Sequence, residues 1–471
     1  MTTLEPGSIV DNFRLGEILY RGGMATLWRV SHPDMTMPLI MKVPRLDYGD
    51  DPAAIVGFEV EQMIMPTLCG THVPRFVAAG DFTVRPYIVM EFIAGPSLRE
   101  ALDRAPLPPA EVAALGAKVA AALHQLHRQH VIHLDLKPSS VLFRANGDAV
   151  LIDFGLAHHN QLPDLLAEQF RLPMGTGPYI SPEQLHGLRN DARSDLFALG
   201  VTLYFLATGE RPFGNPSSIS GLRQRLYREP VPPIVRQQAI PPWLQEIILH
   251  CLEVDPARRY TTAAQIAFDL QNPAQVTLTA RAALRRRSSL AATAGRWLRS
   301  IGHAPVADRS VADHLASAPI VMVAVDLRPG MEALGEALQR ATRQALAAEA
   351  GARLTCVSVL KTSRLALDSN VDSAGRNLHV QRLVGLQHWA RGLDVAAERV
   401  SFHILEAPDP ATAIIEYAHN NDVDHIVIGA RASSALRRFL GSVSARVVAE
   451  ARCSVTVVRT AQTASSGDEK S

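Results

Sequence analysis

The sequence is divided by a stretch that lacks acidic side chains altogether. Between Asp269 and Asp308 there is no Asp or Glu, whereas six arginines fall in the same stretch and Ala, Ser and Thr fill much of the remainder. Such a shift in composition is typical of a segment between domains. It leaves a front region of about 270 residues and a back region of about 140, so we expect at least two domains.

The front region changes from strand-like to helical patterns along its length. Up to about residue 93, short β-rich runs alternate with turns, and one helical stretch at 53–68 interrupts them. Later segments show the helical period, at 110–130, 194–208, 242–252 and 263–270. We therefore expect a small β-rich lobe followed by a larger helical lobe.

The back region alternates strand-like and helical stretches regularly. Its apolar runs of strand type lie at 321–326, 354–360, 399–405, 425–430 and 454–459. Helical patterns separate them, near 331–350, 378–396, 410–420 and 441–450. Strands that alternate with helices in this way predict an α/β domain with a doubly wound parallel sheet.

Composition narrows the class of protein further. The 47 Lys and Arg residues balance 46 Asp and Glu residues, which excludes a strongly basic nucleic-acid binder. The four cysteines lie far apart, so we expect neither a disulfide framework nor a zinc site, and a reducing compartment fits. The N-terminus lacks the pattern of a secretory signal, and no apolar run reaches the length of a membrane span. We therefore expect a cytoplasmic protein without a transmembrane segment.

A glycine-rich turn near the N-terminus could bind phosphate. Gly22 and Gly23 lie between two strand-like runs and would let backbone amides approach a phosphate closely. On that feature alone, a plain hairpin turn is the simpler interpretation. Lys42 follows on a strand and Glu61 on a helix, and an ion pair between them would orient the lysine toward phosphates.

Four motifs in the second half of the front region occur in a known order. They read VIHLDLKPSSVLF at 131–143, VLIDFGLA at 150–157, GTGPYISPEQ at 175–184 and DLFALG at 195–200. On these motifs, residues 13–271 resemble a eukaryotic-like Ser/Thr protein kinase of the kind found in bacteria. The resemblance implies an α+β bilobal kinase fold, transfer of the γ-phosphate of ATP to protein hydroxyls, and a need for Mg²⁺, with Mn²⁺ as an alternative metal.

The resemblance also implies roles for individual residues. Asp135 would accept or orient the proton of the substrate hydroxyl, and Lys137 would contact the γ-phosphate. Thr176, together with Lys137, favours Ser or Thr over Tyr as the substrate residue. Asp153 and Ser140 occupy the places of the metal ligands.

The remaining implied contacts are those with ATP. Lys42 would bind the α- and β-phosphates with Glu61 as its partner, below the turn at Gly22 and Gly23. The further ATP contacts are Leu19, Leu27 and the backbone of Glu91 and Ile93, behind Met90. Residues that resemble structural anchors of the helical lobe are Glu183, Asp195 and Arg259.

The front region departs from the family pattern at several positions. Tyr20 and Ala25 replace two glycines of the phosphate loop, and Ser140 replaces the asparagine that binds a second Mg²⁺. These changes lower the expected turnover, so a weakly active or inactive kinase fold that serves as a nucleotide-gated scaffold is the alternative function. Leu134 replaces the arginine that pairs with a phosphorylated activation loop, and residues 156–174 contain no Ser, Thr or Tyr. We therefore predict activity without the usual activation-loop phosphorylation.

Residues 318–460 resemble a universal stress protein domain, on VMVAVD at the start and on the segment from 423 to 459 at the end. In ATP-binding members, a G-x-x-G segment and a later G-S pair cradle phosphate at a helix N-terminus. Here Gly429, Gly441 and Ser442 match that pattern, whereas alanine replaces the second glycine, and Asp326 resembles the acidic residue near the nucleoside. The domain would sense nucleotide or stress, or would instead bind partners or form a homodimer.

The segment between the domains, 272–317, leaves three interpretations open. A flexible solvated linker is the simplest for its Arg285–Arg287 cluster. Contact with an anionic lipid surface through Trp297 and Leu298 is the second, and autophosphorylation at Ser288 or Ser289 is the third. Residues 461–471 have the composition of a disordered tail.

Overall fold

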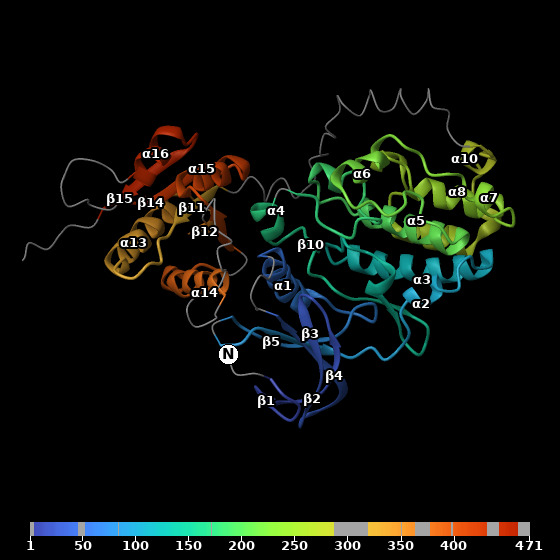
Figure 1. The fold of residues 1–471 in the computed structure, drawn as a ribbon, viewed down its shortest axis with the longest axis horizontal. Coiled ribbons are helices and arrows are strands. Elements are labelled where there is room, and N and C mark those ends of the chain that lie inside the picture. The colour runs from blue at the N-terminus through green and yellow to red at the C-terminus, as the bar shows by residue number, and fades with distance from the viewer. Residues whose placement is uncertain are drawn as a thin grey trace, which may run out of the picture. The chain divides into compact units, whose positions relative to one another are not determined.

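The chain forms two compact units (Figure 1). The computed structural model describes residues 4–45, 52–82, 84–170, 172–286, 319–349, 351–362, 377–396, 399–430 and 442–459. The first unit comprises Met1–Arg45, Ala53–Gln161 and Phe170–Arg309. The second comprises Leu46–Pro52, Leu162–Gln169 and Ser310–Ser471.

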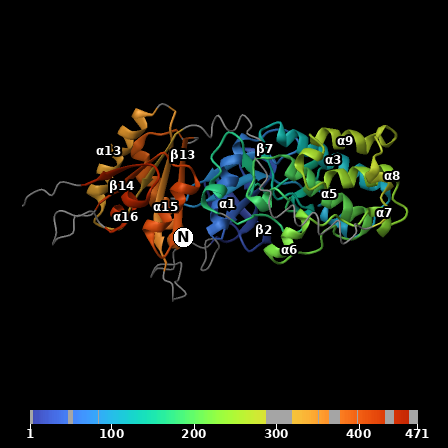
Figure 2. The same cartoon turned by 90° about the horizontal axis from the view of Figure 1, so that it is seen from above.

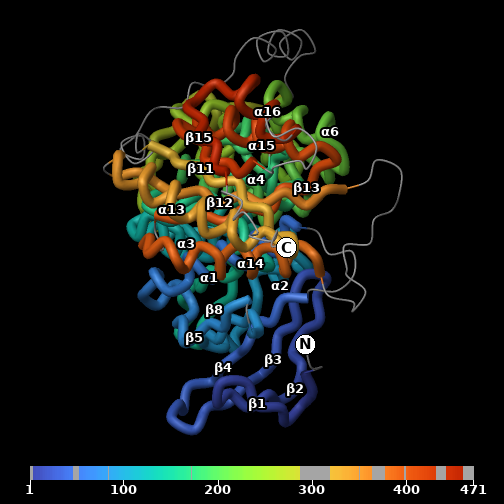
Figure 3. Tube along the Cα trace, turned by 90° about the vertical axis from the view of Figure 1, so that its left-hand side faces the viewer, coloured from blue at the N-terminus to red at the C-terminus, as the bar shows by residue number. Residues whose placement is uncertain are grey.

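The first unit begins with an antiparallel sheet in the order β1-β2-β3-β4-β6-β5. Figure 3 shows β2, β3 and β4 running beside one another. The strands are β1 Ile9–Val10, β2 Phe13–Arg21, β3 Ala25–His32, β4 Met35–Pro44, β5 Phe76–Gly80 and β6 Tyr87–Glu91. Alternate residues of these strands point to one face and form its core, which contains Phe13, Leu15, Trp28, Val30, Leu39, Met41, Tyr87 and Val89. Helix α1, Pro52–Ile64, buries its apolar residues in the same lobe.

The rest of the first unit is mainly helical. Its long helices are α3 Pro109–His127, α5 Arg193–Thr208, α8 Pro242–Cys251 and α9 Ala263–Gln271. Figure 2 shows α3, α5 and α9 alongside one another. Helix α5 is apolar over most of its circumference and is buried on every face, as such a helix must be. Shorter helices are α2 Arg99–Leu102, α6 Ile219–Arg223, α7 Pro233–Arg236 and α10 Ala280–Ala283.

Two short pairs of antiparallel strands lie between α3 and α5 in the sequence. The first pairs β7 Val131–Ile132 with β10 His158–His159, and the second pairs β8 Val141–Phe143 with β9 Ala149–Leu151. The loop from β7 to β8 contains Asp135, and the chain after β9 contains Asp153. Both pairs therefore fix the ends of segments that the sequence marks as chemically important.

The second unit contains a parallel sheet in the order β13-β12-β11-β14-β15. Its strands are β11 Ile320–Ala324, β12 Arg353–Lys361, β13 Val400–Ala407, β14 His425–Gly429 and β15 Ser454–Val458. The connecting helices are α13 Glu332–Ala348, α14 Leu378–Ala390, α15 Pro410–Asn420 and α16 Ser442–Glu450. Because the first two crossovers run one way along the sheet and the last two run back, right-handed connections place the two helix pairs on opposite faces.

The predicted fold class is confirmed in both parts. A β-rich lobe is followed by a helical lobe, and a doubly wound parallel sheet follows them. The structure adds a feature that the sequence did not predict: helix α4, Leu165–Gln169, comes from the front region but belongs to the second unit, where it packs beside β13 and α15. No helix among the described residues is long and apolar enough to cross a membrane. The linker positions Ser288, Ser289, Trp297 and Leu298 lie outside the described residues, as does the segment 461–471.

The segment after β6 makes a close backbone approach at Gly95. A Cβ atom built on Gly95 would lie 1.5 Å from the carbonyl oxygen of Phe143 and 2.7 Å from its carbonyl carbon. Both are backbone atoms, so no side chain could move to make room. The approach is held by the Leu98 N–H, which donates to the Val141 carbonyl at 2.9 Å, and by the Phe143 N–H, which donates to the Pro96 carbonyl at 3.0 Å.

We therefore expect Gly95→Ala to lower the free energy of unfolding of the first unit by about 2–3 kcal/mol. Urea denaturation measures this quantity. Gly23→Ala is the matched control, because a Cβ atom there meets no atom within 4 Å, and it should change stability by less than about 0.5 kcal/mol. Equal stabilities of the two variants would contradict the prediction.

Candidate active site

A lysine and two carboxylates meet where strand β4, helix α1 and the chain after β9 come together. Lys42 Nζ lies 2.5 Å from Glu61 Oε2 and 3.1 Å from Asp153 Oδ1. The Glu61 side chain is only 2% exposed, whereas that of Asp153 is 48% exposed. Burial alone would lower the pKa of Lys42, but the two carboxylates outweigh it and raise that pKa. The cluster thus keeps a cation next to an accessible carboxylate.

Asp153 is held in a conformation that non-glycine residues seldom adopt. Its φ is 71°, in the left-handed region, and the next residue, Phe154, is fully buried against the His133 ring. The charge of Lys42 outweighs burial and lowers the pKa of Asp153 to about 2. Asp153 therefore carries a full negative charge at neutral pH. An accessible carboxylate of this kind is a hard oxygen donor and fits Mg²⁺.

Asp135 faces the segment that contains Thr176. Its Oδ1 accepts the Thr176 N–H at 2.7 Å, and its Oδ2 accepts a short hydrogen bond from Lys137 Nζ. Lys137 Nζ also donates to Thr176 Oγ1 at 3.2 Å. The structure thus brings together the three residues that the sequence marked as catalytic. The carboxylate can accept a proton beside a cation that neutralises negative charge.

Asp195 of helix α5 fixes the loop that carries Asp135. Its carboxylate accepts the N–H groups of His133 and Leu134, both at 2.9 Å, and contacts His127 Nε2 at 2.8 Å. Leu134 has a φ of 60°, so these bonds hold a strained residue directly before Asp135. Burial would raise the pKa of Asp195, but the bonds with His127 and the His133 backbone outweigh it and lower that pKa.

Ser140 is used by the backbone of the same loop. Its Oγ accepts the Lys137 N–H at 3.0 Å and donates to the Lys137 carbonyl at 2.8 Å. The side chain is short and buried, so its hydroxyl closes a turn rather than extending away from it. Whether Ser140 also binds metal stays a prediction.

The predicted ATP contacts lie around the first sheet. Gly22 N–H donates to the Ala25 carbonyl at 3.0 Å, which closes the turn between β2 and β3. Tyr20 is 62% exposed beside this turn, and Leu19 and Leu27 are half-buried on the two strands. At the end of β6, the Glu91 carboxylate binds the Arg144 guanidinium, with Oε2 2.8 Å from Nη2.

Ile93, two residues after Glu91, is buried, and so is Met90, immediately before Glu91. The Glu91 carboxylate points to Arg144 of the helical lobe, so the side chain joins the two lobes of the first unit. This leaves backbone groups of the segment, and not the Glu91 side chain, for any contact with a base.

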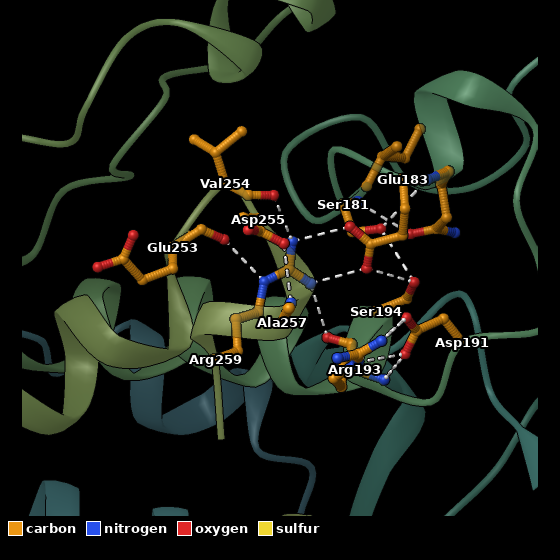
Figure 4. A network of polar contacts seen from close by, with 12 residues as sticks. Ser181, Glu183, Asp191, Arg193, Ser194, Glu253, Val254, Asp255, Ala257 and Arg259 are labelled. Atoms are coloured by element: carbon orange, nitrogen blue, oxygen red, sulfur yellow. Dashed lines mark hydrogen bonds and ion pairs between the residues drawn. The ribbon is translucent and has the colours of Figure 1, made fainter. Parts of the chain in front are cut away.

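The helical lobe is anchored by a buried ion pair, shown in Figure 4. Arg259 Nη1 and Nη2 bind the two oxygens of Glu183 at 2.7 and 2.8 Å, and Ser194 Oγ donates to the same carboxylate at 2.7 Å. Arg259 also donates to the backbone carbonyls of Arg193, Glu253 and Val254. The guanidinium thus binds carbonyls of two separate segments while it holds Glu183, which follows Ser181 and Pro182.

Sequence reasoning missed Arg225, which holds the chain directly after Thr176. Its side chain is 1% exposed and donates to the carbonyls of Gly177, at 2.8 Å, and Ile180. Burial lowers the pKa of Arg225 to about 10. A single arginine in an ordinary helical segment gives no sequence signal for this role.

The predicted nucleotide residues of the second unit are described only in part. Asp326 follows β11 and accepts a hydrogen bond from Arg328 Nε at 2.8 Å. Gly429 ends β14, where a Cβ atom would lie 2.7 Å from Leu334, and Ser442 begins α16. Gly441 lies outside the described residues. Asp326, Gly429 and Ser442 all belong to the second unit.

Comparison with known proteins gives two family matches. Residues 14–269 match the model of the protein kinase domain, and residues 319–459 match that of the universal stress protein family. The chain is 33% identical over 276 residues to the serine/threonine-protein kinase PknB of Mycobacterium leprae, with 57% of this chain and 44% of that protein covered. It is 32% identical over 272 residues to a probable serine/threonine-protein kinase of Streptomyces coelicolor, with 57% and 40% covered.

The chain therefore spans less than half the length of these curated relatives. Among solved structures, the PknI kinase domain of Mycobacterium tuberculosis matches with 22% identity and a TM-score of 0.44. That match covers 58% of this chain and all of the solved one.

The bonds to Asp195 predict the effect of replacing its carboxylate. Asp195→Asn leaves one oxygen for three donors and turns an N–H group toward one of them, so we expect the first unit to lose about 3 kcal/mol of unfolding free energy. Urea denaturation measures the loss. The exposed Asp103→Asn is the matched control and should stay within about 0.5 kcal/mol of the unchanged protein. A loss that is no larger at Asp195 than at Asp103 would show that the carboxylate does not hold the loop.

Proposed function

The chain belongs to the protein kinase family, and on that premise we propose that it transfers the γ-phosphate of ATP to Ser or Thr hydroxyls of proteins. The observation that carries the proposal is the contact of Asp135 with both Lys137 and Thr176. Phosphoryl transfer needs positioning and neutralisation of charge more than covalent chemistry, and these residues provide both.

In the proposed reaction, the substrate oxygen forms a bond to the γ-phosphorus while the bond from that phosphorus to the bridging oxygen breaks, and ADP leaves. Asp135 accepts the proton of the attacking hydroxyl. Lys137 lies beside the same carboxylate and neutralises the charge on the transferred group. Thr176 has its N–H on Asp135 and its hydroxyl on Lys137, so it fixes both side chains at the point where a substrate hydroxyl would enter. The protein substrates themselves are not specified by these residues.

Lys42 and Asp153 are proposed to hold the phosphates of ATP and a divalent metal. Asp153 offers an ionised, accessible carboxylate, and Lys42 offers a cation fixed by Glu61. When bound, Mg²⁺ neutralises phosphate charge. One carboxylate together with phosphate oxygens of the substrate is a usual set of ligands for Mg²⁺.

Backbone atoms of Glu91 and Ile93, with Leu19, Leu27 and the turn at Gly22 and Gly23, are proposed to bind the remainder of ATP. The exposed Tyr20 would then lie at the edge of this turn.

One observation favours the weaker alternative, a slow or inactive kinase fold that acts as a nucleotide-gated scaffold. Ser140 Oγ is engaged with the backbone of Lys137, where the family has a longer amide side chain. A second metal would then have a poorer ligand at this position.

For the second unit we propose a sensing or pairing role. Strand β15 lies at one edge of the parallel sheet, and an edge strand can pair with a second copy of the chain. Binding of nucleotide near Asp326, Gly429 and Ser442 is the other role that the family resemblance implies. A cytoplasmic location likewise stays a prediction.

Transfer of phosphate should depend on Asp135. We expect Asp135→Asn to lower the rate of transfer from γ-labelled ATP by at least about 100-fold, because the amide cannot accept the hydroxyl proton. The assay uses a generic basic protein as acceptor, with Mg²⁺ or Mn²⁺, and Asp103→Asn as the control variant. Absence of transfer by the unchanged protein with either metal, despite ATP binding, would contradict the proposal and favour the scaffold.

Activity should not depend on a phosphorylated activation loop. Residues 156–174 contain no hydroxyl side chain, and Leu134 cannot pair with a phosphate. We therefore expect phosphatase-treated protein, verified by mass spectrometry, to keep its initial rate of transfer within about twofold. A strict requirement for phosphate on Thr176 would contradict this prediction.

A further inference from the structure

Helix α4 ties the activation loop, 156–174, to the second unit. The chain leaves the first unit after Gln161 and returns to it at Phe170. Between these points α4, Leu165–Gln169, packs against β13 and α15, and Figure 3 shows it beside them. Leu165 and Leu166 are buried, so the helix is held by more than polar contacts. The segment Leu162–Gln169, from the middle of the front region, thus belongs to the same compact unit as the C-terminal domain.

The carboxylate of Glu168 is bound by four side chains of that domain. Its Oε2 accepts hydrogen bonds from His403 Nε2 at 2.7 Å and from Ser401 Oγ and the Tyr417 hydroxyl, both at 3.1 Å. Its Oε1 accepts a hydrogen bond from Arg353 Nη2 at 2.9 Å. We refer to Arg353, Ser401, His403 and Tyr417 as the Glu168 socket.

The socket is built by the strands of the parallel sheet and the helix that covers them. Arg353 is on β12, Ser401 and His403 are two residues apart on β13 and share a face, and Tyr417 is on α15. The Tyr417 ring packs on the His403 ring with centroids 5.3 Å apart, which fixes both donors. Donors placed in this way on a rigid sheet form a prepared site for an anion.

Two further hydrogen bonds attach α4, one to its backbone and one from the side chain of its last residue, Gln169. Asn421 Nδ2 donates to the Glu168 carbonyl at 3.3 Å, and Gln169 Nε2 donates to the Ile404 carbonyl at 2.9 Å. The Glu168 side chain is 12% exposed. Burial would raise the pKa of Glu168, but the contacts with His403 and Arg353 outweigh it and lower that pKa. The carboxylate is therefore charged at neutral pH.

In the first unit of the same structure, the candidate active-site residues contact one another. Lys42 pairs with Glu61, Phe154 is buried, and Thr176 is bonded to Asp135. The loop that leads to Thr176 has no hydroxyl that could be phosphorylated, and Leu134 supplies no cation to bind a phosphate. The loop instead carries the negative charge of Glu168, which has its own set of donors.

We propose that the C-terminal domain binds Glu168 and thereby holds the activation loop in its active conformation. This contact takes the place of phosphorylation of the loop. The part of the inference that concerns activity rests on the kinase function proposed above. The attachment of α4 through Glu168 does not, so the two are tested by different readouts.

The test compares Glu168→Gln with the unchanged full-length protein. The amide keeps the size of the side chain but removes the charge and turns an N–H group toward donors. We expect hydrogen–deuterium exchange of the amides of 165–169 to become faster by at least about tenfold, and phosphate transfer to become slower by at least about fivefold. The matched control is Glu416→Gln on the exposed face of α15, which should change neither rate.

A second variant keeps the test valid if Glu168→Gln disturbs folding of the domain. Tyr417→Phe removes one hydrogen bond to Glu168 and retains the ring that packs on His403. We expect exchange in 165–169 to rise by about threefold in this variant. Amides of β11 and β14 should remain protected, which shows that the sheet is intact.

The outcomes separate the inference from the proposed function. Unchanged exchange in 165–169 in both variants would overturn the attachment, whatever the activity. Faster exchange with unchanged transfer, or with faster transfer, would overturn the activating role, and faster transfer would mean that the contact inhibits. If the unchanged protein transfers no phosphate, the proposed function and the activating role both fail, and exchange alone still decides the attachment.

Discussion

The carboxylate of Asp195 is the group on which the geometry of the candidate active site depends. Asp195 lies in α5, which is buried on every face, and its oxygens accept the N–H groups of the two residues that precede Asp135. One of these, Leu134, has a left-handed backbone that needs such support. The position of Asp135 is therefore set by a core helix and not by the loop itself. Gln184 adds to the same effect, because its Nε2 donates to the Leu134 carbonyl at 2.8 Å.

Carboxylates that bind partners far away in the sequence occur in both units. Glu61 and Glu183 are buried and Glu168 is largely buried, and their carboxylates accept hydrogen bonds from partners 19, 76 and 235 residues away in the sequence. Loss of one partner leaves a buried charge, which costs about 3–5 kcal/mol, whereas the intact pair adds little net stability. These contacts therefore act mainly to fix one arrangement of distant segments. Each of them joins a segment near the proposed chemistry to a rigid element.

Local pattern was enough to predict the order of strands and helices, whereas the groups at the centre of the candidate site were predicted from the resemblance to the kinase family. Apolar periodicity gave the lobes and the parallel sheet, because burial of one face imposes that period directly. The motifs around Asp135 and Asp153 marked residues that the structure brings together. Arg225, Glu168 and helix α4 could not be predicted, because their roles depend on contacts with segments far away in the sequence. An acidic residue in a loop has the same local pattern whether it is solvated or bound in a socket.

The binding of Glu168 also accounts for two losses that are separate in the sequence. An arginine at position 134 could stabilise the activation loop only if the loop carried a phosphate. In the same way, a phosphorylated hydroxyl in 156–174 could fix the loop only if such an arginine bound it. A carboxylate that is bound elsewhere removes the need for both. Its charge is constant at neutral pH, whereas phosphorylation adds and removes about 1.5–2 charges. Control of the loop must then come from a change in the affinity of the socket, and a ligand can change that affinity only if it binds the two states of the C-terminal domain differently.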